Sequence, residues 1–179
     1  MSAPGTAAAR IRIGVSSCLL GMQVRYDGGH KRSDCVAGLL ADLFECVPVC
    51  PELEAGLGVP RPAMRLAAGA AGPRLVEIAS GRDHTQRLED FARARLQALA
   101  AQQLSGYILK KDSPSCGLTR VEVTRSGSAP ERDGRGLFAA ELLRVFAELP
   151  VEEEDRLEDP ALRESFIERV FAHRRLREL

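Results

Sequence analysis

Short apolar runs alternate along the chain with segments whose apolar residues recur every three or four positions. Apolar runs bounded by turn residues are typical of buried strands, and the three-and-four spacing is typical of helices that pack by one face. The runs predict strands over 11–15, 44–49, 75–78, 106–109 and 120–124. The helical spacing predicts helices over 35–44, 83–104, 137–148 and 159–179. This alternation predicts an α/β fold with a mainly parallel sheet.

The segments between these elements carry the signals of caps and loops. Ser33 or Asp34 is expected to cap the first helix. Glycine and proline are dense over 56–73, which predicts a long irregular connection. The alternation of charged and β-branched residues over 120–124 predicts an edge or solvent-facing strand, and a polar loop is expected over 126–136.

The length and the amino-acid composition are ordinary for one globular domain. The chain has 179 residues, 45% of them hydrophobic and 28% charged, so it buries enough surface to fold without disulfides. Lys and Arg total 25, and Asp and Glu also total 25, so no basic surplus favours binding to a nucleic-acid polymer. No apolar run has the length of a membrane span, and the start of the chain lacks a signal-peptide pattern. We therefore expect a cytoplasmic protein with a flexible leader over 1–10.

Three of the five cysteines follow predicted strands. An odd number of irregularly spaced cysteines argues against a disulfide framework and for metal or thiolate chemistry. Cys18, Cys50 and Cys116 each follow a strand directly or after a short loop, and ligands bind at the edge where the carboxyl ends of parallel strands meet. Thiolates that converge there favour zinc, copper or an iron–sulfur cluster. Cys35 and Cys46 are expected to be buried packing thiols.

A ligand set of three cysteines leaves several chemistries open. A closed structural zinc site uses four protein ligands, usually with a C-x-x-C pair, which the chain lacks. A [4Fe-4S] cluster on three cysteines keeps one iron with an open position, which can act as a Lewis acid or bind a substrate sulfur. The alternatives are an electron-transfer iron–sulfur protein, which three ligands disfavour, and a non-catalytic zinc- or thiol-containing binding module.

Six short motifs occur in order along nearly the whole chain. They are Ser17-Cys18-Leu19-Leu20-Gly21, Arg25-Tyr26-Asp27-Gly28, Cys50-Pro51-Glu52, Pro60-Arg61, Gly81-Arg82-Asp83 with Thr85, and Lys110 through Ser113-Pro114-Ser115-Cys116-Gly117. Together they resemble the thiouracil desulfurase family. The resemblance implies a Rossmann-like three-layer sandwich and a [4Fe-4S] cluster held by Cys18, Cys50 and Cys116. It also implies non-redox desulfuration of thiolated uracil compounds, such as 4-thiouridine, thio-UMP or 2-thiouracil, to uracil compounds and sulfide.

The resemblance also implies a catalytic pair and a set of substrate-binding side chains. Glu52, carried by the same loop as Cys50, is the expected general base that activates water, and Ser113 is expected to orient or relay the proton. Asp83 and Thr85 can also be read as helix caps beside an anion site, and Ser113 as a turn residue. The expected substrate-binding residues are Ser17, Tyr26, Asp27, Asp83, Thr85 and Ser115.

The end of the chain resembles the longer members of the family, in which a second domain follows. The resemblance rests on Pro150-Val151-Glu152-Glu153-Glu154 and on the helical stripe of the last predicted helix, whose expected N-cap is Asp159. We expect a leader over 1–10, a desulfurase domain over 11–150 and a C-terminal helical extension over 151–179. A second domain beyond 179, or a partner bound to the tail helix, is a further expectation.

Overall fold

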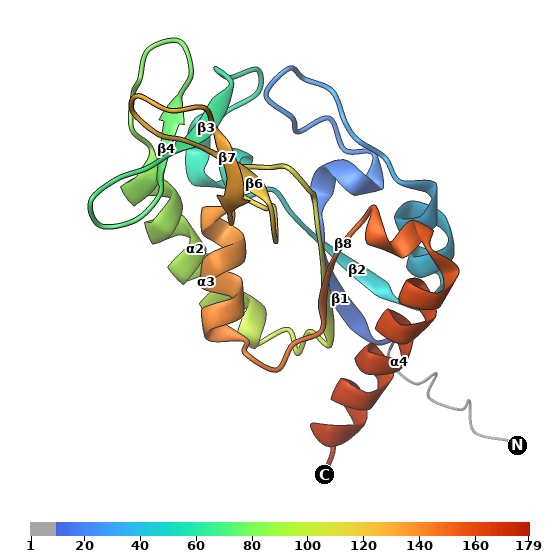
Figure 1. The fold of residues 1–179 in the computed structure, drawn as a ribbon. Helices are drawn as coiled ribbons and strands as arrows, with labels where there is room; N and C mark the ends of the chain where they lie inside the picture. The colour runs from blue at the N-terminus through green and yellow to red at the C-terminus, as the bar shows by residue number, and fades with distance from the viewer. Residues whose placement is uncertain (1–9) are drawn as a thin grey trace, which may run out of the picture.

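A four-stranded parallel sheet forms the centre of the computed structural model, which describes residues 10–179 (Figure 1). Its strands lie in the order β2 (Glu45–Val49), β1 (Arg12–Ser16), β5 (Gly106–Leu109) and β8 (Val151–Glu153). β1 pairs in parallel with β2 on one side and with β5 on the other. The direction of strand addition therefore reverses at β1, and ligands of open α/β sheets bind outside the carboxyl ends of the strands at such a point.

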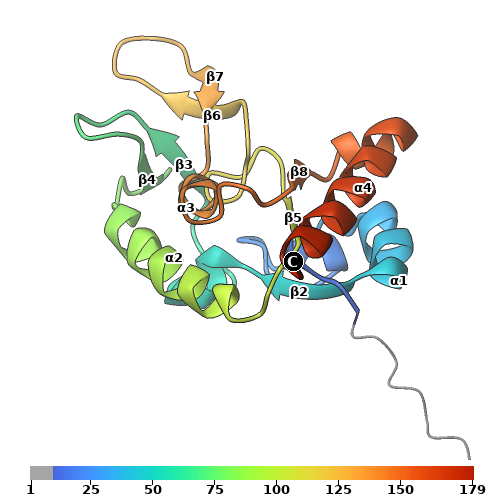
Figure 2. The same ribbon diagram turned by 90° about the horizontal axis from the view of Figure 1, so that it is seen from below.

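Helices cover both faces of this sheet, as Figure 2 shows. On one face lie α2 (Thr85–Ala100) and α3 (Leu137–Val145). On the other lie α4 (Pro160–Leu176) and α1 (Ala41–Leu43), which continues a wide π-type helical segment, Cys35–Leu40. The first core contains Val49, Leu96, Tyr107, Phe138 and Leu142, and the second contains Ile13, Val36, Leu40, Ile108, Phe166 and Val170. The predicted three-layer, Rossmann-like α/β fold is confirmed.

A second, mixed sheet lies beyond the carboxyl ends of the central strands (Figure 1). Its order is β4 (Arg74–Glu77), β3 (Met64–Ala67), β6 (Val121–Thr124) and β7 (Glu131–Gly134). β3 and β6 are parallel, whereas the two outer pairs are antiparallel. Leu66, Leu75 and Val123 pack from this sheet against Leu88 of α2 and Leu137 of α3, so the small sheet is fixed to one helical layer.

Several element predictions are wrong in this second sheet. The connection over 56–73 contains β3, and the loop over 126–136 contains β7. β7 has no apolar side chain. It pairs through its main chain with β6, and its side chains form the ion pairs of Glu131 and Asp133 with Arg125 and of Arg132 with Asp112. The segment 120–124 is not at an edge, because β7 covers the side of β6 that faces away from β3. Main-chain pairing of polar strands leaves no hydrophobic period to detect.

The helix predictions are correct in place and differ at their ends. Ser33 caps the first helical segment, since its hydroxyl accepts from the Val36 N–H at 3.2 Å. Asp159 caps α4 by accepting from two backbone N–H groups of the first turn. The helices predicted over 83–104 and 137–148 are shorter, Thr85–Ala100 and Leu137–Val145.

The C-terminal segment is built into the same fold. β8 was not predicted, because its sequence is acidic rather than apolar. It pairs in parallel with β5 at the sheet edge. α4 buries Phe166 and Val170 completely in the core formed with β1. The expected domain boundary at 150 and the second domain stay predictions, and all of the expected leader except Arg10 lies outside the described residues. Over 10–179, no helix is both long and apolar enough to cross a membrane.

Candidate active site

A cavity of about 630 Å³ lies at the carboxyl ends of β1, β2 and β5. Cys18, Cys50 and Cys116 all line it, although they are far apart in the sequence. The three strands that precede these cysteines are neighbours in one parallel sheet, so their ends converge. The cavity therefore occupies the position where ligands bind in this class of fold.

Backbone just beyond each strand presents the thiols. Cys18 stands in a 3-10 turn, Ser17–Leu20, that Gly21 closes at φ +88°, a left-handed conformation that suits glycine. Cys50 follows β2 directly, and its thiol donates to the Val24 carbonyl oxygen at 3.7 Å. Cys116 lies in the loop after β5.

Ser113 shapes the turn that carries Cys116. Its hydroxyl oxygen accepts from the backbone N–H groups of Ser115 at 3.2 Å and Cys116 at 3.0 Å. Its carbonyl oxygen accepts from the Gly117 N–H at 2.8 Å. Since the hydroxyl accepts in both of its bonds, its hydrogen is free to point into the cavity that Ser113 also lines.

The start of α3 holds the same turn in place. The backbone N–H groups of Leu137 and Phe138 donate to the carbonyl oxygens of Pro114 at 3.2 Å and Ser115 at 2.9 Å. These are first-turn N–H groups that have no partner within their own helix. The Cys116 turn is thus hydrogen-bonded to the end of a core-packed helix.

Burial dominates the electrostatics of the three thiols. It raises the pKa of Cys18 to about 11, and the nearby Cys50 adds to the rise. Burial also raises the pKa of Cys50, and raises that of Cys116 well above the ordinary value despite a hydrogen bond with Ser16 that lowers it. Metal binding at such a site releases the thiol protons.

The three thiols come from three different elements and face one cavity. The thiols influence one another's pKa, so they lie near each other. Yet within 10–179 no three His, Cys, Asp or Glu side chains gather closely enough to hold one metal ion. Thiolates on a single zinc all lie about 2.3 Å from it, whereas separate irons of a [4Fe-4S] cluster each take their own thiolate. Three soft donors at one cavity fit an iron–sulfur cluster.

Glu52 projects from the loop after Cys50 and is held at both carboxylate oxygens. Oε1 accepts from the Ser115 hydroxyl at 2.7 Å, and Oε2 lies 2.8 Å from Nε and 2.7 Å from Nη2 of Arg61. Arg61 Nη1 donates to the carbonyl oxygens of Val24 at 3.0 Å and Gly58 at 2.8 Å. The exposed fractions of the Arg61 and Glu52 side chains are 5% and 13%, so the pair is largely desolvated and fixed in one geometry. Arg61 belongs to the Pro60-Arg61 motif of the sequence, but the sequence alone assigned it no role.

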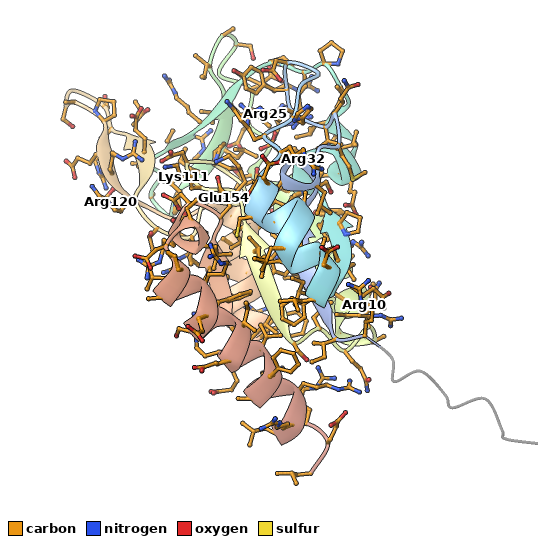
Figure 3. The ribbon with its side chains drawn as sticks, turned by 90° about the vertical axis from the view of Figure 1, so that its right-hand side faces the viewer. Arg10, Arg25, Arg32, Lys111, Arg120 and Glu154 are labelled. Atoms are coloured by element: carbon orange, nitrogen blue, oxygen red, sulfur yellow. The ribbon has the colours of Figure 1, made fainter. Side chains whose placement is uncertain are left out.

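Basic side chains form another part of the cavity wall. Arg25, Lys31, Lys110 and Lys111 line it, and the Arg25 guanidinium lies 5.5 Å from the centroid of the Tyr26 ring. Lys110 forms an ion pair with Glu154, which also accepts from the Lys111 N–H at 2.7 Å. Figure 3 shows Arg25, Lys111 and Glu154 towards one end of the molecule and Arg10 towards the other. The Glu154 contact was not predicted, because 44 residues separate the partners.

Comparison with known proteins identifies the family. The model of the 2-thiouracil desulfurase family matches residues 13–154. The chain belongs to the 2-thiouracil desulfurase family. YbbK of Bacillus subtilis (strain 168), a protein described as uncharacterized, is 36% identical over 108 residues, which are 58% of this chain and 71% of YbbK. A solved structure described as the [4Fe-4S]-dependent thiouracil desulfidase TudS has 34% identity and a TM-score of 0.69, covering 87% of this chain and 99% of that one.

The cavity of this 2-thiouracil desulfurase family member contains most of the side chains expected at the site. Ser17, Tyr26, Glu52 and Ser113 line it with the three cysteines. Ser115 is buried behind Glu52 and reaches the site through that carboxylate. The remaining roles assigned from the sequence stay predictions.

Besides Ser115, the expected substrate-binding residues Asp27, Asp83 and Thr85 do not line the cavity. Asp27 closes its own turn by accepting from the Gly29 N–H at 2.9 Å, which lowers the Asp27 pKa. Asp83 accepts from the Thr85 N–H at 2.8 Å and pairs with Arg74 at 2.7 Å, so it serves as a local cap at the start of α2.

The two remaining cysteines also lie away from the cavity wall. Cys35 and Cys46 are partly buried and pack against the core that contains Ile13. The Cys35 thiol donates to the Leu157 carbonyl oxygen at 3.4 Å. These positions agree with packing thiols, although both keep more exposure than was expected.

Proposed function

We propose that this protein is a [4Fe-4S]-dependent desulfurase that converts thiolated uracil compounds and water into uracil compounds and sulfide. The C=S bond is replaced by C=O, and no electron is gained or lost in the sum. The observation that carries the proposal is the convergence of three buried thiols and one fixed carboxylate on a single cavity. Membership of the 2-thiouracil desulfurase family and the likeness to TudS support it.

Cys18, Cys50 and Cys116 would hold the cluster. With three protein ligands, a bound cluster supplies an iron with an open position that can bind the substrate sulfur as a Lewis acid. The apolar and buried surroundings of Cys116 exclude water from the ligand side. Family membership and the likeness to TudS disfavour the alternative of a zinc module, and three ligands disfavour an electron-transfer protein.

Glu52 is the proposed general base. The contacts of Arg61 and Ser115 fix its carboxylate at the cavity wall, so it can take a proton from a water molecule that attacks the thiocarbonyl carbon. Ser113, whose hydroxyl hydrogen is uncommitted, is proposed to orient the substrate or relay that proton.

The substrate is proposed to carry a phosphate. Five cationic side chains line the cavity: Arg25, Lys31, Arg61, Lys110 and Lys111. Arg61 is paired with Glu52, Lys110 with Glu154 and Lys111 with Asp155. Lys31, and Arg25 at 3.8 Å from Asp27, are therefore the cations proposed to meet the phosphate of a thiouridine nucleotide such as thio-UMP. Tyr26, with an exposed fraction of 42%, presents a ring on which a pyrimidine can stack.

A reducing compartment suits this chemistry. Free cysteines and an iron–sulfur site are expected in the cytoplasm, where thiols stay reduced, and we propose that location. The partner is proposed to be a small molecule rather than a nucleic-acid polymer. We also propose that a second domain follows residue 179 or that a partner binds the tail helix.

The deciding experiment is an anaerobic absorbance spectrum with iron and sulfide analysis, followed by addition of thio-UMP or 2-thiouracil. We expect a brown protein with about four irons that bleaches the near-ultraviolet thiocarbonyl band and releases sulfide. Glu52→Gln should keep the iron and lose turnover, whereas Cys116→Ala should lose the iron. Cys46→Ala, a thiol outside the cavity wall, should keep both. A protein that stays colourless after anaerobic reconstitution would refute the proposal.

A further inference from the structure

Glu54 connects Cys50 to helix α2. The Cys50 N–H donates to Glu54 Oε1 at 2.8 Å, and the Glu54 N–H donates back to the Cys50 carbonyl oxygen at 2.9 Å. Glu54 Oε2 lies 2.9 Å from Nε of Arg95, which projects from α2. Reciprocal bonds of this kind fix the backbone at a helix start, as in a capping box.

The turn after Cys50 is only partly packed, since Leu53 and Ala55 touch the cores while remaining partly exposed. The segment Leu53–Leu57 contains no fully buried residue, and Gly56 within it has φ +81°. Helix α2, in contrast, buries Leu96 and Leu99 completely. The ion pair of Glu54 and Arg95 is therefore a direct link between a lightly packed turn and a rigid part of the core.

The position of Arg95 shows that this link is specific. Its Nε is buried and has no hydrogen-bond acceptor of suitable geometry among the described residues, so the nearby Glu54 carboxylate is its charge partner. The exposed fractions of the two side chains are 23% and 32%, which leaves the pair less screened than a free surface pair.

We propose that Glu54, anchored by Arg95, is a positioning residue that holds Cys50 in its ligand geometry. The inference rests on the proposed cluster site. Groups that orient metal ligands typically change metal affinity 10- to 100-fold when they are removed. Without Glu54 the backbone at Cys50 loses its side-chain acceptor, and the turn that also carries Glu52 loses its tie to α2.

The test is the rate at which the reconstituted protein loses its visible iron–sulfur absorbance to an iron chelator under anaerobic conditions. Glu54→Ala should accelerate the loss by about 10-fold, and Glu54→Gln, which keeps an acceptor for the Cys50 N–H, should restore most of the slow rate. Arg95→Ala should have a smaller effect. The double variant Glu54→Ala/Arg95→Ala should match Glu54→Ala, because Arg95 acts through Glu54.

Arg93→Ala is the matched control. It removes the Asp90 ion pair from the same helix without touching the Cys50 turn, and it should leave the loss rate unchanged. The melting temperatures of the cluster-free variants should differ by no more than a few degrees, so general destabilisation cannot explain a fast loss. Equal loss rates for Glu54→Ala and Arg93→Ala, or additive effects of Glu54 and Arg95, would overturn the inference. A parent protein that takes up no cluster would instead refute the proposed function.

Discussion

Glu52 and Arg61 form a buried ion pair whose geometry is set by main-chain carbonyls. Nη1 of Arg61 donates to the carbonyl oxygens of Val24 and Gly58, while Nε and Nη2 donate to the Glu52 carboxylate. Removing one partner of a buried pair leaves the other charge desolvated and uncompensated. The pair is therefore expected to matter for stability as well as for the proposed proton transfer.

Arg61→Met should lower the free energy of unfolding by about 3 kcal/mol, because Glu52 is left buried without its countercharge. Urea unfolding of the cluster-free proteins measures this change. The double variant Arg61→Met/Glu52→Gln should recover more than half of the loss. A double variant as unstable as Arg61→Met would show that the charge is not the cause.

Asp83 gives a stability contribution that depends on pH. The hydroxyl and N–H of Thr85, together with Arg74, hold its pKa at about 2, below the ordinary 3.8. A lowered pKa means that the contribution is complete above about pH 4 and disappears as the pH falls towards 2. Asp83→Asn should cost no more than about 1 kcal/mol at neutral pH, because more than a third of the side chain is exposed. Urea unfolding at several pH values should show the gap between the two proteins constant above pH 5 and closing between about pH 4 and pH 2; a constant gap would contradict the assignment.

Among single residues, the sequence best predicted the reactive side chains that directly follow a strand. Cys18, Cys50 and Cys116 could be grouped because a parallel sheet brings strand ends together. The partners of Glu52 and Lys110 could not be found in this way, because such ion pairs depend on how loops fold over one another. Asp83 shows the opposite case. Its hydrogen bonds at the start of α2 are to sequence neighbours and could be predicted, whereas its position away from the cavity depends on the tertiary fold and could not.

The turn that holds Cys116 and the first turn of α3 form one unit. Their backbones approach so closely that Gly136, at the junction, has no room for a side chain. An added Cβ would lie 2.5 Å from the Ser115 carbonyl and 2.8 Å from the Cys116 nitrogen. The conformation of the Cys116 turn thus depends on a glycine outside the cysteine motif.

Gly136→Ala should therefore disturb the Cys116 turn. We expect a loss of about 2 kcal/mol in the free energy of unfolding, as for other overpacked sites, and a lower iron content after reconstitution. Gly38→Ala is the control, since a Cβ there meets no atom within 4 Å and alanine favours a helix. Normal stability and iron content in Gly136→Ala would show that the two elements can separate without cost.

Elements with a hydrophobic period were predictable, and elements held by polar groups were not. β1, β2 and β5 stand out as apolar runs, and the stripes of α2 and α4 are clear in the sequence. β8 is acidic, yet its carboxylates are satisfied: Glu153 accepts from the N–H groups of Leu118 at 2.8 Å and Thr119 at 3.3 Å. Burial of charged groups with partners leaves no signal in a hydrophobic pattern.

Across the whole molecule, the last thirty residues complete the core that the first hundred begin. β8 closes one edge of the central sheet and places Glu153 and Glu154 against the loop that carries Cys116. α4 then covers the face of β1 with Phe166 and Val170. Strand β8 and helix α4 of the predicted C-terminal extension therefore pair with and pack on the central sheet.

A chain ending at Pro150 should consequently fail to form the native core. Removing β8 and α4 exposes apolar surface on the central sheet and leaves the Lys110 ammonium without its carboxylate. We expect no cooperative urea transition and no cluster uptake, measured by circular dichroism and iron analysis. Phe166→Ala, a milder change in the same layer, should stay folded and lose about 4 kcal/mol. A cooperative, iron-loaded truncated protein would show that residues 1–150 suffice.

The spacing of the cysteines has a consequence for biogenesis. Because β1, β2 and β5 must be side by side before Cys18, Cys50 and Cys116 meet, the ribosome must release most of the chain before a complete ligand set exists. Parallel pairing over such distances is slow to form. We therefore expect the proposed cluster to assemble only on a chain in which β1, β2 and β5 have already paired.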